Sequence, residues 1–116
     1  MKKPQAPNPV RQGDLLFIYP GDPSYRKPTG KLTRQAPKGG RCIVARGEAT
    51  GHHHSFNARV GVMELDEGGV TYLTLDQLTK IKHQEHAPAV LNPDKLIEVR
   101  RQTEWTDANE PRQVLD

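Results

Sequence analysis

The stretch Gly13-Asp14-Leu15-Leu16-Phe17-Ile18-Tyr19-Pro20-Gly21 decides the fold class. Its central residues form a continuous apolar run of strand length, and turn residues stand on both sides of the run. We therefore predict the strongest core strand of the protein at residues 15–19.

Further short strands are expected downstream of this one. Apolar and β-branched residues gather in several short runs, and the sequence Asp66-Glu67-Gly68-Gly69 between two of them is typical of a hairpin turn. Gly61 marks the expected position of a β-bulge. Residues 75–83 fit either a strand or a single helical turn. The predicted strands are 41–46, 58–65, 70–75, 89–91 and 95–102.

The composition agrees with a β-structure. Ten prolines and ten glycines among 116 residues argue against a helical bundle, because both residue types interrupt helix interiors. The length suits one domain. About seven short strands without a helix longer than two turns predict an all-β fold, a small single-domain barrel or sandwich.

The chain divides into three parts. Residues 1–12 are polar and rich in proline, so we expect a flexible N-terminal arm. Residues 13–102 form the β-domain, and residues 103–116 form a polar C-terminal tail. Within the domain, residues 20–41 form a long basic loop with six lysines and arginines against one acid, Asp22. Loops of this length are often functional or disordered.

Several cellular settings can be excluded or favoured. No apolar run approaches the roughly 20 residues that a membrane helix needs, so we expect no membrane association. The basic N-terminus has no apolar segment behind it, which argues against a secretory signal. Cys42 is the only cysteine and cannot form an intrachain disulfide. These features favour the cytoplasm.

The net charge of +3 permits nucleic-acid contact without requiring it.

All five histidines fall into two short clusters, His52-His53-His54 and His83-Gln84-Glu85-His86. In an extended chain, residues two apart share a face, so His52 and His54 can point one way while His53 points the other. His83 and His86 meet if the chain turns at this point. Two pairs of imidazoles on neighbouring strands could then converge on one ion.

We therefore predict a divalent-metal site, most readily a zinc site, with His52, His54, His83 and His86 as ligands. Glu85 or Glu64 could act as a further ligand, as a partner of a ligand or as a general base. A fourth histidine would close a tetrahedral site and make it structural, whereas three would leave a position for water. The role is thus structural or weakly enzymatic. The alternatives are solvated or hydrogen-bonded histidines and a metal-free catalytic or pH-sensing role.

Two resemblances bear on this site. A β-context with His-x-His and later histidines resembles in part the cupin arrangement, in which metal ligands line a small barrel. The chain more closely resembles a group of uncharacterised small bacterial and phage-encoded proteins, which implies that the four histidines belong to one recurring set but implies no activity. The segments that carry the second resemblance are residues 11–16, 47–54, 83–88 and 100–105.

Two other functions compete with metal binding. The basic loop could contact nucleic-acid phosphates, with Tyr25 stacking on a base. The small core, with only 34% apolar residues, and the polar ends would also suit a homo-oligomeric structural or interaction protein. The cations of the nucleic-acid hypothesis are Arg26, Lys27, Lys31, Arg34, Lys38 and Arg41.

Overall fold

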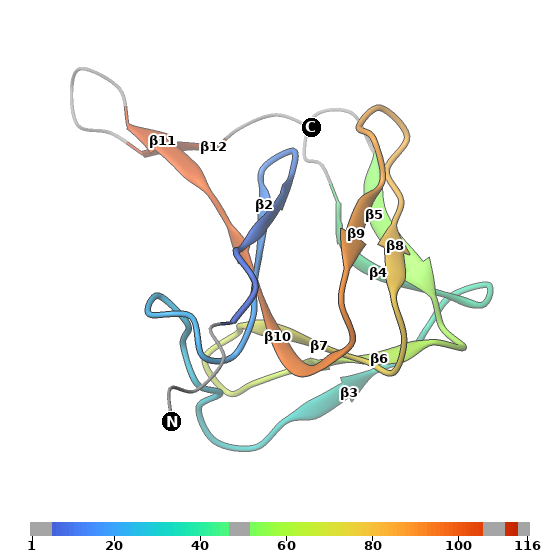
Figure 1. Ribbon diagram of the computed structural model, residues 1–116, viewed down its shortest axis with the longest axis horizontal. Coiled ribbons are helices and arrows are strands. Elements are labelled where there is room, and N and C mark those ends of the chain that lie inside the picture. The colour runs from blue at the N-terminus through green and yellow to red at the C-terminus, as the bar shows by residue number, and fades with distance from the viewer. Residues whose placement is uncertain (1–5, 47–51, 106–110, 114–116) are drawn as a thin grey trace.

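The computed structural model describes residues 6–46, 52–105 and 111–113, and the protein is all-β as predicted (Figure 1). Within these residues there are twelve short strands and no helix. The sequence predicted about seven strands. The five additional ones are a five-residue strand, His53–Asn57, and four three-residue strands. The strand predicted at 58–65 begins only at Gly61, because residues 58–60 turn. The sequence Gly47-Glu48-Ala49-Thr50-Gly51, which is typical of a turn, lies outside the described residues.

A six-stranded antiparallel sheet forms the larger layer of the domain, in the order β1-β2-β10-β7-β6-β3. The predicted core strand at 15–19 lies inside this sheet as β2. The hairpin predicted at residues 66–69 joins β6 to β7, with Gly69 at a φ of 85°. The strands are β1 (Val10–Gln12), β2 (Leu15–Ile18), β10 (Asp94–Arg101), β7 (Thr71–Leu75), β6 (Gly61–Leu65) and β3 (Thr33–Gln35).

Two further hairpins complete the body of the domain. The first pairs β4 (Arg41–Arg46) with β5 (His53–Asn57), and the second pairs β8 (Thr79–Ile81) with β9 (Ala89–Leu91). Ser55 and Lys82 exchange two backbone hydrogen bonds of 2.9 and 2.8 Å, which place β8 beside β5. The ambiguous stretch 75–83 therefore contains a strand. Among the described residues no ladder joins β4 to the six-stranded sheet, so the barrel stays open there.

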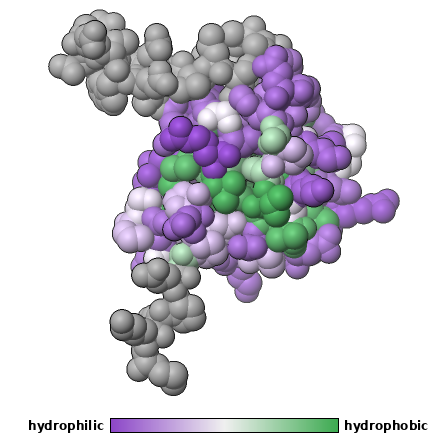
Figure 2. All heavy atoms as spheres, turned by 45° about the horizontal axis from the view of Figure 1, so that its top comes forward, coloured by the Kyte–Doolittle hydropathy of each residue, from purple (hydrophilic) through white to green (hydrophobic). Residues whose placement is uncertain are grey.

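The hydrophobic core fills the space between the large sheet and the two hairpins. Phe17 and Leu73 come from the large sheet, while Phe56, Ile81 and Leu91 come from the hairpins, and none of these five side chains is exposed. Burial of side chains from both layers is what binds the hairpins to the sheet. Figure 2 shows that hydrophobic residues also gather in the middle of one face, with hydrophilic residues around them.

The predicted β-bulge at Gly61 is wrong, because the ladder between β6 and β7 is regular there. Gly61 instead allows a close approach of the two strands: a Cβ at this position would lie 2.4 Å from the carbonyl oxygen of Thr74. The register shifts elsewhere, between Asp94 and Ile97 in β10. Leu96, in that interval, has a φ of 56°, a conformation that is strained for a bulky residue.

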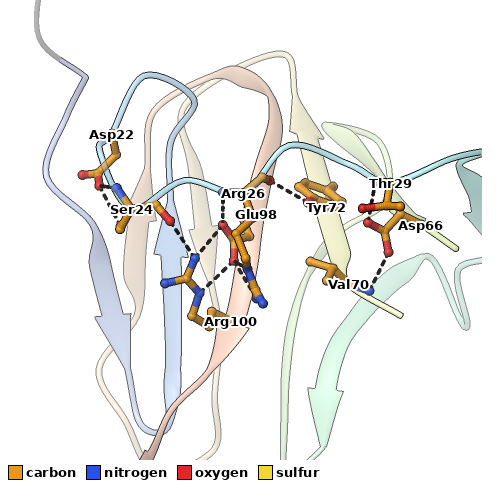
Figure 3. Close-up of polar contacts among 9 residues, drawn as sticks. All are labelled: Asp22, Ser24, Arg26, Thr29, Asp66, Val70, Tyr72, Glu98 and Arg100. Carbon is orange, nitrogen blue, oxygen red and sulfur yellow. Dashed lines mark hydrogen bonds and ion pairs between the residues drawn. The ribbon is translucent and has the colours of Figure 1, made fainter. Parts of the chain in front are cut away.

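The basic segment 20–41 is pinned to the large sheet. The Tyr25 hydroxyl donates to the Leu96 carbonyl at 2.7 Å, and the Tyr72 hydroxyl donates to the Arg26 carbonyl at the same distance. The Thr29 amide donates to the Asp66 carboxylate at 2.9 Å (Figure 3). We call residues 22–29 the strap, because they cross the sheet and cover part of it.

The two ends of the chain also contribute strands. β1 lies within the segment 1–12, and β11 (Thr103–Trp105) pairs with β12 (Pro111–Gln113) within the segment 103–116. Figure 1 shows this last hairpin extending away from the body of the domain. No helix in the described part of the chain is long and apolar enough to span a membrane.

Candidate functional site

Four histidine rings gather between β5 and the turn that follows β8. The ring centroid of His83 lies 4.5 Å from that of His54, 4.5 Å from that of His86 and 5.6 Å from that of His52. These are the four residues that the sequence pattern grouped together. The bridge between Ser55 and Lys82 brings them together, because it sets the start of β5 beside the end of β8.

His53 stands apart from these ring contacts. Its backbone amide donates to the side-chain oxygen of Gln84 at 2.9 Å, and its Nδ1 lies 3.2 Å from the Gln84 amide nitrogen. The alternation of a strand explains the difference between His53 and its neighbours. His53 therefore offers a matched control for any experiment on the other histidines.

His54 is the buried centre of the cluster, and Gln12 fixes its tautomer. His54 has no exposed surface, and its Nδ1 lies 2.8 Å from the Gln12 side-chain oxygen. The Gln12 amide nitrogen donates to the carbonyls of Ile81 and Ala87 at 2.7 and 2.9 Å, so the Gln12 oxygen must accept. His54 consequently carries a proton on Nδ1, so the lone pair of the ring in its neutral form lies on Nε2.

A buried carboxylate lies on the other side of His54. The Asp14 carboxylate is 3.8 Å from the His54 Nε2, and it accepts a hydrogen bond from the Arg101 guanidinium. Arg101 also donates to the Arg46 carbonyl at 2.9 Å. Sequence reasoning missed Gln12, Asp14 and Arg101 as parts of this site. The available signal was two polar residues, Gln12 and Asp14, that flank a glycine directly before the strongest core strand.

His83 holds the turn that carries His86. Its Nδ1 accepts the backbone amides of Glu85 and His86 at 3.1 and 3.2 Å. A neutral His83 ring with an accepting Nδ1 carries its proton on Nε2. The turn that the sequence suggested between His83 and His86 is therefore closed by the His83 side chain itself.

The two predicted carboxylates lie in different places. Glu85 is at the edge of the cluster, with its carboxylate 3.5 Å from the His52 Nδ1. Glu64 lies on β6, opposite Arg34 and Tyr72 in the large sheet. In the described part of the chain, no group of three or more His, Cys, Asp or Glu side chains is arranged to hold a metal ion as it stands.

The six cations of the nucleic-acid hypothesis fall into two groups. Arg26 forms an ion pair with Glu98 at 2.8 Å, and Arg41 donates to the hydroxyl and carbonyl oxygens of Ser55 at 2.9 and 3.1 Å. The remaining four are exposed side chains that lie along one segment. They are Lys27, Lys31, Arg34 and Lys38.

A second buried polar centre lies beneath the strap. Glu98 is fully buried, although neighbouring residues of a strand point to opposite faces and both Ile97 and Val99 belong to the core. Its carboxylate accepts from the backbone and side chain of Arg26 and from the side chain of Arg100, all at 2.8 Å (Figure 3). Burial alone would raise the pKa of Glu98, but these hydrogen bonds from Arg100 and Arg26 outweigh burial and lower it.

Comparison with known proteins gives a family without an assigned activity. Neither the curated proteins nor the solved structures contain a match to the chain. A family model described as a domain of unknown function (DUF8820) matches residues 11–102, which includes both histidine clusters and the buried Glu98. The chain therefore belongs to the DUF8820 family.

Proposed function

We propose that the histidine cluster binds one divalent transition-metal ion, with zinc as the first candidate, and that the ion ties β5 to the turn after β8. The observation that carries this proposal is the packing of three histidine rings around the ring of His83. Imidazole is a ligand suited to zinc and to other late first-row metals.

The surroundings of His54 support the proposal. Metal-binding histidines usually donate their second ring N–H to a carbonyl or carboxylate oxygen, which orients the ring and fixes its tautomer. Gln12 supplies that oxygen and is itself held by two backbone carbonyls. The Nε2 of His54 is thereby prepared as the ligand atom.

A structural role follows from where the cluster lies. Only two backbone hydrogen bonds, between Ser55 and Lys82, join the β4–β5 and β8–β9 hairpins in the described part of the chain. An ion held by His54 from one side and by His83 and His86 from the other would add a strong connection at this point. Metal-binding free energy contributes directly to folding free energy when the unfolded chain has no site.

Metal binding requires a local rearrangement at His83. The proton on its Nε2 would have to leave, and a metal-bound ring normally carries a proton on Nδ1. That proton would face the amides of Glu85 and His86, which now donate to Nδ1. We therefore expect zinc to shift the NMR amide signals of Glu85 and His86 more than those of the hairpin residues Glu67 and Gly68.

The direct test is metal analysis and calorimetry on protein prepared without a polyhistidine tag. We expect one zinc ion per chain. At a free zinc concentration about 100 times the Kd, the free energy of unfolding should rise by about 2.7 kcal/mol. The test variants are His83→Gln and the double variant His52→Gln/His86→Gln, and both should lose most of this gain.

His53→Gln is the matched control, because it removes a neighbouring imidazole that makes none of the ring contacts. It should bind zinc as the unsubstituted protein does. Less than half an equivalent of zinc in the unsubstituted protein would refute the proposal. Equal losses in the His53 and His83 variants would also refute it, since they would indicate unspecific binding by surface histidines.

Nucleic-acid binding by the basic segment has weaker support. Arg26 and Arg41 are engaged inside the fold, which leaves four exposed cations spread along the chain. An electrostatic interface of that size would bind weakly and lose affinity steeply with salt. A gel-shift series across salt concentrations separates this function from metal binding, because it does not depend on the histidines.

A further inference from the structure

A pocket of about 560 Å³ opens where β4 fails to join the large sheet. Its apolar wall is formed by Leu15 of β2, Val44 of β4 and Val99 of β10, and Val70 lies at its rim. Pockets of about 300–1,000 Å³ have the size of typical small-molecule sites, and the lining of this one combines apolar residues with three arginines. Leu15, Val44 and Val99 are only 1%, 8% and 9% exposed, so a ligand in this pocket would contact the accessible edges of these core side chains.

The polar part of the pocket wall consists of Arg26, Arg100 and Arg101. Arg101 is paired with Asp14. Arg26 and Arg100 share the single carboxylate of Glu98, so this trio carries two positive charges and one negative charge, a net charge of +1. Guanidinium groups stay charged at all physiological pH values. The carboxylates of Asp66 and Asp22 also attract Arg26 and Arg100, so the two arginines act here as positioned hydrogen-bond donors and not as an uncompensated charge.

Glu98 also fixes the orientation of the two guanidinium groups. Arg26 and Arg100 each use Nε and Nη2 toward Glu98, and the Nη2 of Arg100 also donates to the Ser24 carbonyl at 2.8 Å (Figure 3). Among the described residues the Nη1 groups of both arginines have no partner. The side chains are 54% and 28% exposed. Donors held in place in this way lose little entropy when they bind an anion.

We propose that this pocket binds a small molecule with an apolar body and one carboxylate. The carboxylate accepts hydrogen bonds from Arg26 and Arg100, and the apolar body packs against Leu15, Val44 and Val99. The two oxygens of a carboxylate match the two Nη1 donors of Arg26 and Arg100. A phosphate monoester carries nearly two negative charges at neutral pH, and the carboxylates of Asp66 and Asp22 beside the two arginines disfavour that larger charge.

The experiment compares octanoate with octan-1-ol by calorimetry and by NMR. The two probes share the apolar chain and differ in charge. We expect octanoate to bind at least about tenfold more tightly than the alcohol. The NMR signals of Val44, Val70 and Val99 should shift more than those of the β8–β9 hairpin.

Two variants separate the charge from the shape of the pocket. Arg26→Gln removes one of the two guanidinium donors while Arg100 still pairs with Glu98, and it should weaken octanoate binding at least about tenfold. Lys27→Gln is the matched control, because it removes an exposed charge next to Arg26 that does not line the pocket, and it should change the affinity by less than about twofold. Val70→Phe fills the pocket, keeps every charge and should also weaken binding.

The proposal is overturned if octanoate does not bind or binds no better than octan-1-ol. It is also overturned if Arg26→Gln and Lys27→Gln weaken binding equally, or if the shifted signals lie outside the pocket. Should Arg26→Gln fail to fold, the Val70→Phe variant decides the matter, because unchanged octanoate affinity in that variant excludes this pocket. Zinc plays no part in these measurements, so their outcome is independent of the metal-site proposal.

Discussion

Glu98 and His54 are both completely buried polar side chains, yet their surroundings differ in kind. Glu98 is held by two arginines and a backbone amide, whose charges and protons do not change near neutral pH. His54 lies next to the ring of His83, which in turn touches the ring of His86. Imidazoles gain and lose protons near neutral pH and bind metals.

The contrast is between a centre whose groups stay fixed and one whose groups can change. The partners of Glu98 fasten the strap to the sheet, and no step of chemistry requires them to change. The neighbours of His54 are groups whose protonation and ligation can change, placed where two hairpins meet. Permanent partners hold donors in fixed positions, as the pocket proposed beside Glu98 requires, whereas neighbouring imidazoles can exchange protons or bind a metal, as the proposal for the histidine cluster requires.

The largest effect should come from removing the Glu98 carboxylate. Glu98→Ala removes the carboxylate that accepts hydrogen bonds from Arg26 and Arg100. The strap then loses its hydrogen bonds to β10 at Arg26. Loss of one member of a buried ion pair is strongly destabilising, and since both arginines can still reach water we expect a loss of about 3 kcal/mol in the free energy of unfolding. Urea denaturation measures it. Asp76→Ala, an exposed carboxylate, should cost less than about 0.5 kcal/mol, and equal losses would contradict a structural role for Glu98.

The next effect concerns the support of His54. Gln12→Leu removes hydrogen bonds to the His54 ring and to the carbonyls of Ile81 and Ala87, which should cost about 2 kcal/mol. It should also weaken zinc binding by about tenfold or more, the usual effect of losing a group that orients a metal ligand. The exposed Gln77→Leu variant is the control. If zinc affinity is unchanged in Gln12→Leu, the Gln12–His54 pair is structural only.

A smaller effect is expected at alkaline pH on the Glu98 side of the molecule. Burial and the nearby carboxylates of Asp66 and Glu98 raise the pKa of Tyr72 to about 12. A raised pKa in the folded state means that Tyr72 contributes stability below pH 10, which is lost as the pH rises from 10 to about 12. In a spectrophotometric titration, Tyr72→Phe should remove the last tyrosine to ionise. If the last ionisation step of the titration is the same with and without the Tyr72 hydroxyl, then Tyr72 ionises earlier than expected and is more exposed than the structure shows.

The smallest effect is an acid-induced loss of stability from Glu98 itself. Its pKa is lowered in the folded state, so its contribution is complete above the ordinary glutamate pKa. The contribution is lost as the pH falls through the lowered pKa of the folded protein. Denaturation at a series of acidic pH values should show a steeper decline for the unsubstituted protein than for Glu98→Gln. Parallel curves would mean that the pKa of Glu98 does not change on folding.

The local patterns predicted most of the longer strands. The apolar run at 15–19 and the runs predicted at 58–65 and 70–75 contain β2, β6 and β7, because burial of their side chains stabilises the same local geometry that their sequences favour. The first three residues of the run at 58–65 form a turn instead. The hairpin at 66–69 followed from its turn residues. By contrast, β1 and β3 are three-residue strands with few apolar residues. They are extended because they form backbone hydrogen bonds with β2 and β6.

The candidate site was predictable as a set of residues but not as an arrangement. The spacing of His52 and His54 indicated a shared face, and the cluster at 83–86 indicated a turn. Gln12, Asp14 and Arg101 could not be assigned to the site, because they reach it from distant parts of the chain. The same holds for Glu98, whose alternation with Ile97 pointed away from the core.

By itself, the sequence determined that this protein is a small all-β domain with histidines in two places. Those properties depend on neighbouring residues, through turn preferences and the two-residue period of strands. Only the tertiary structure decided that β5 lies beside β8, that the strap buries Glu98 and that a pocket stays open beside β4. Each of these depends on contacts between residues far apart in the chain, whose free energy no local pattern records.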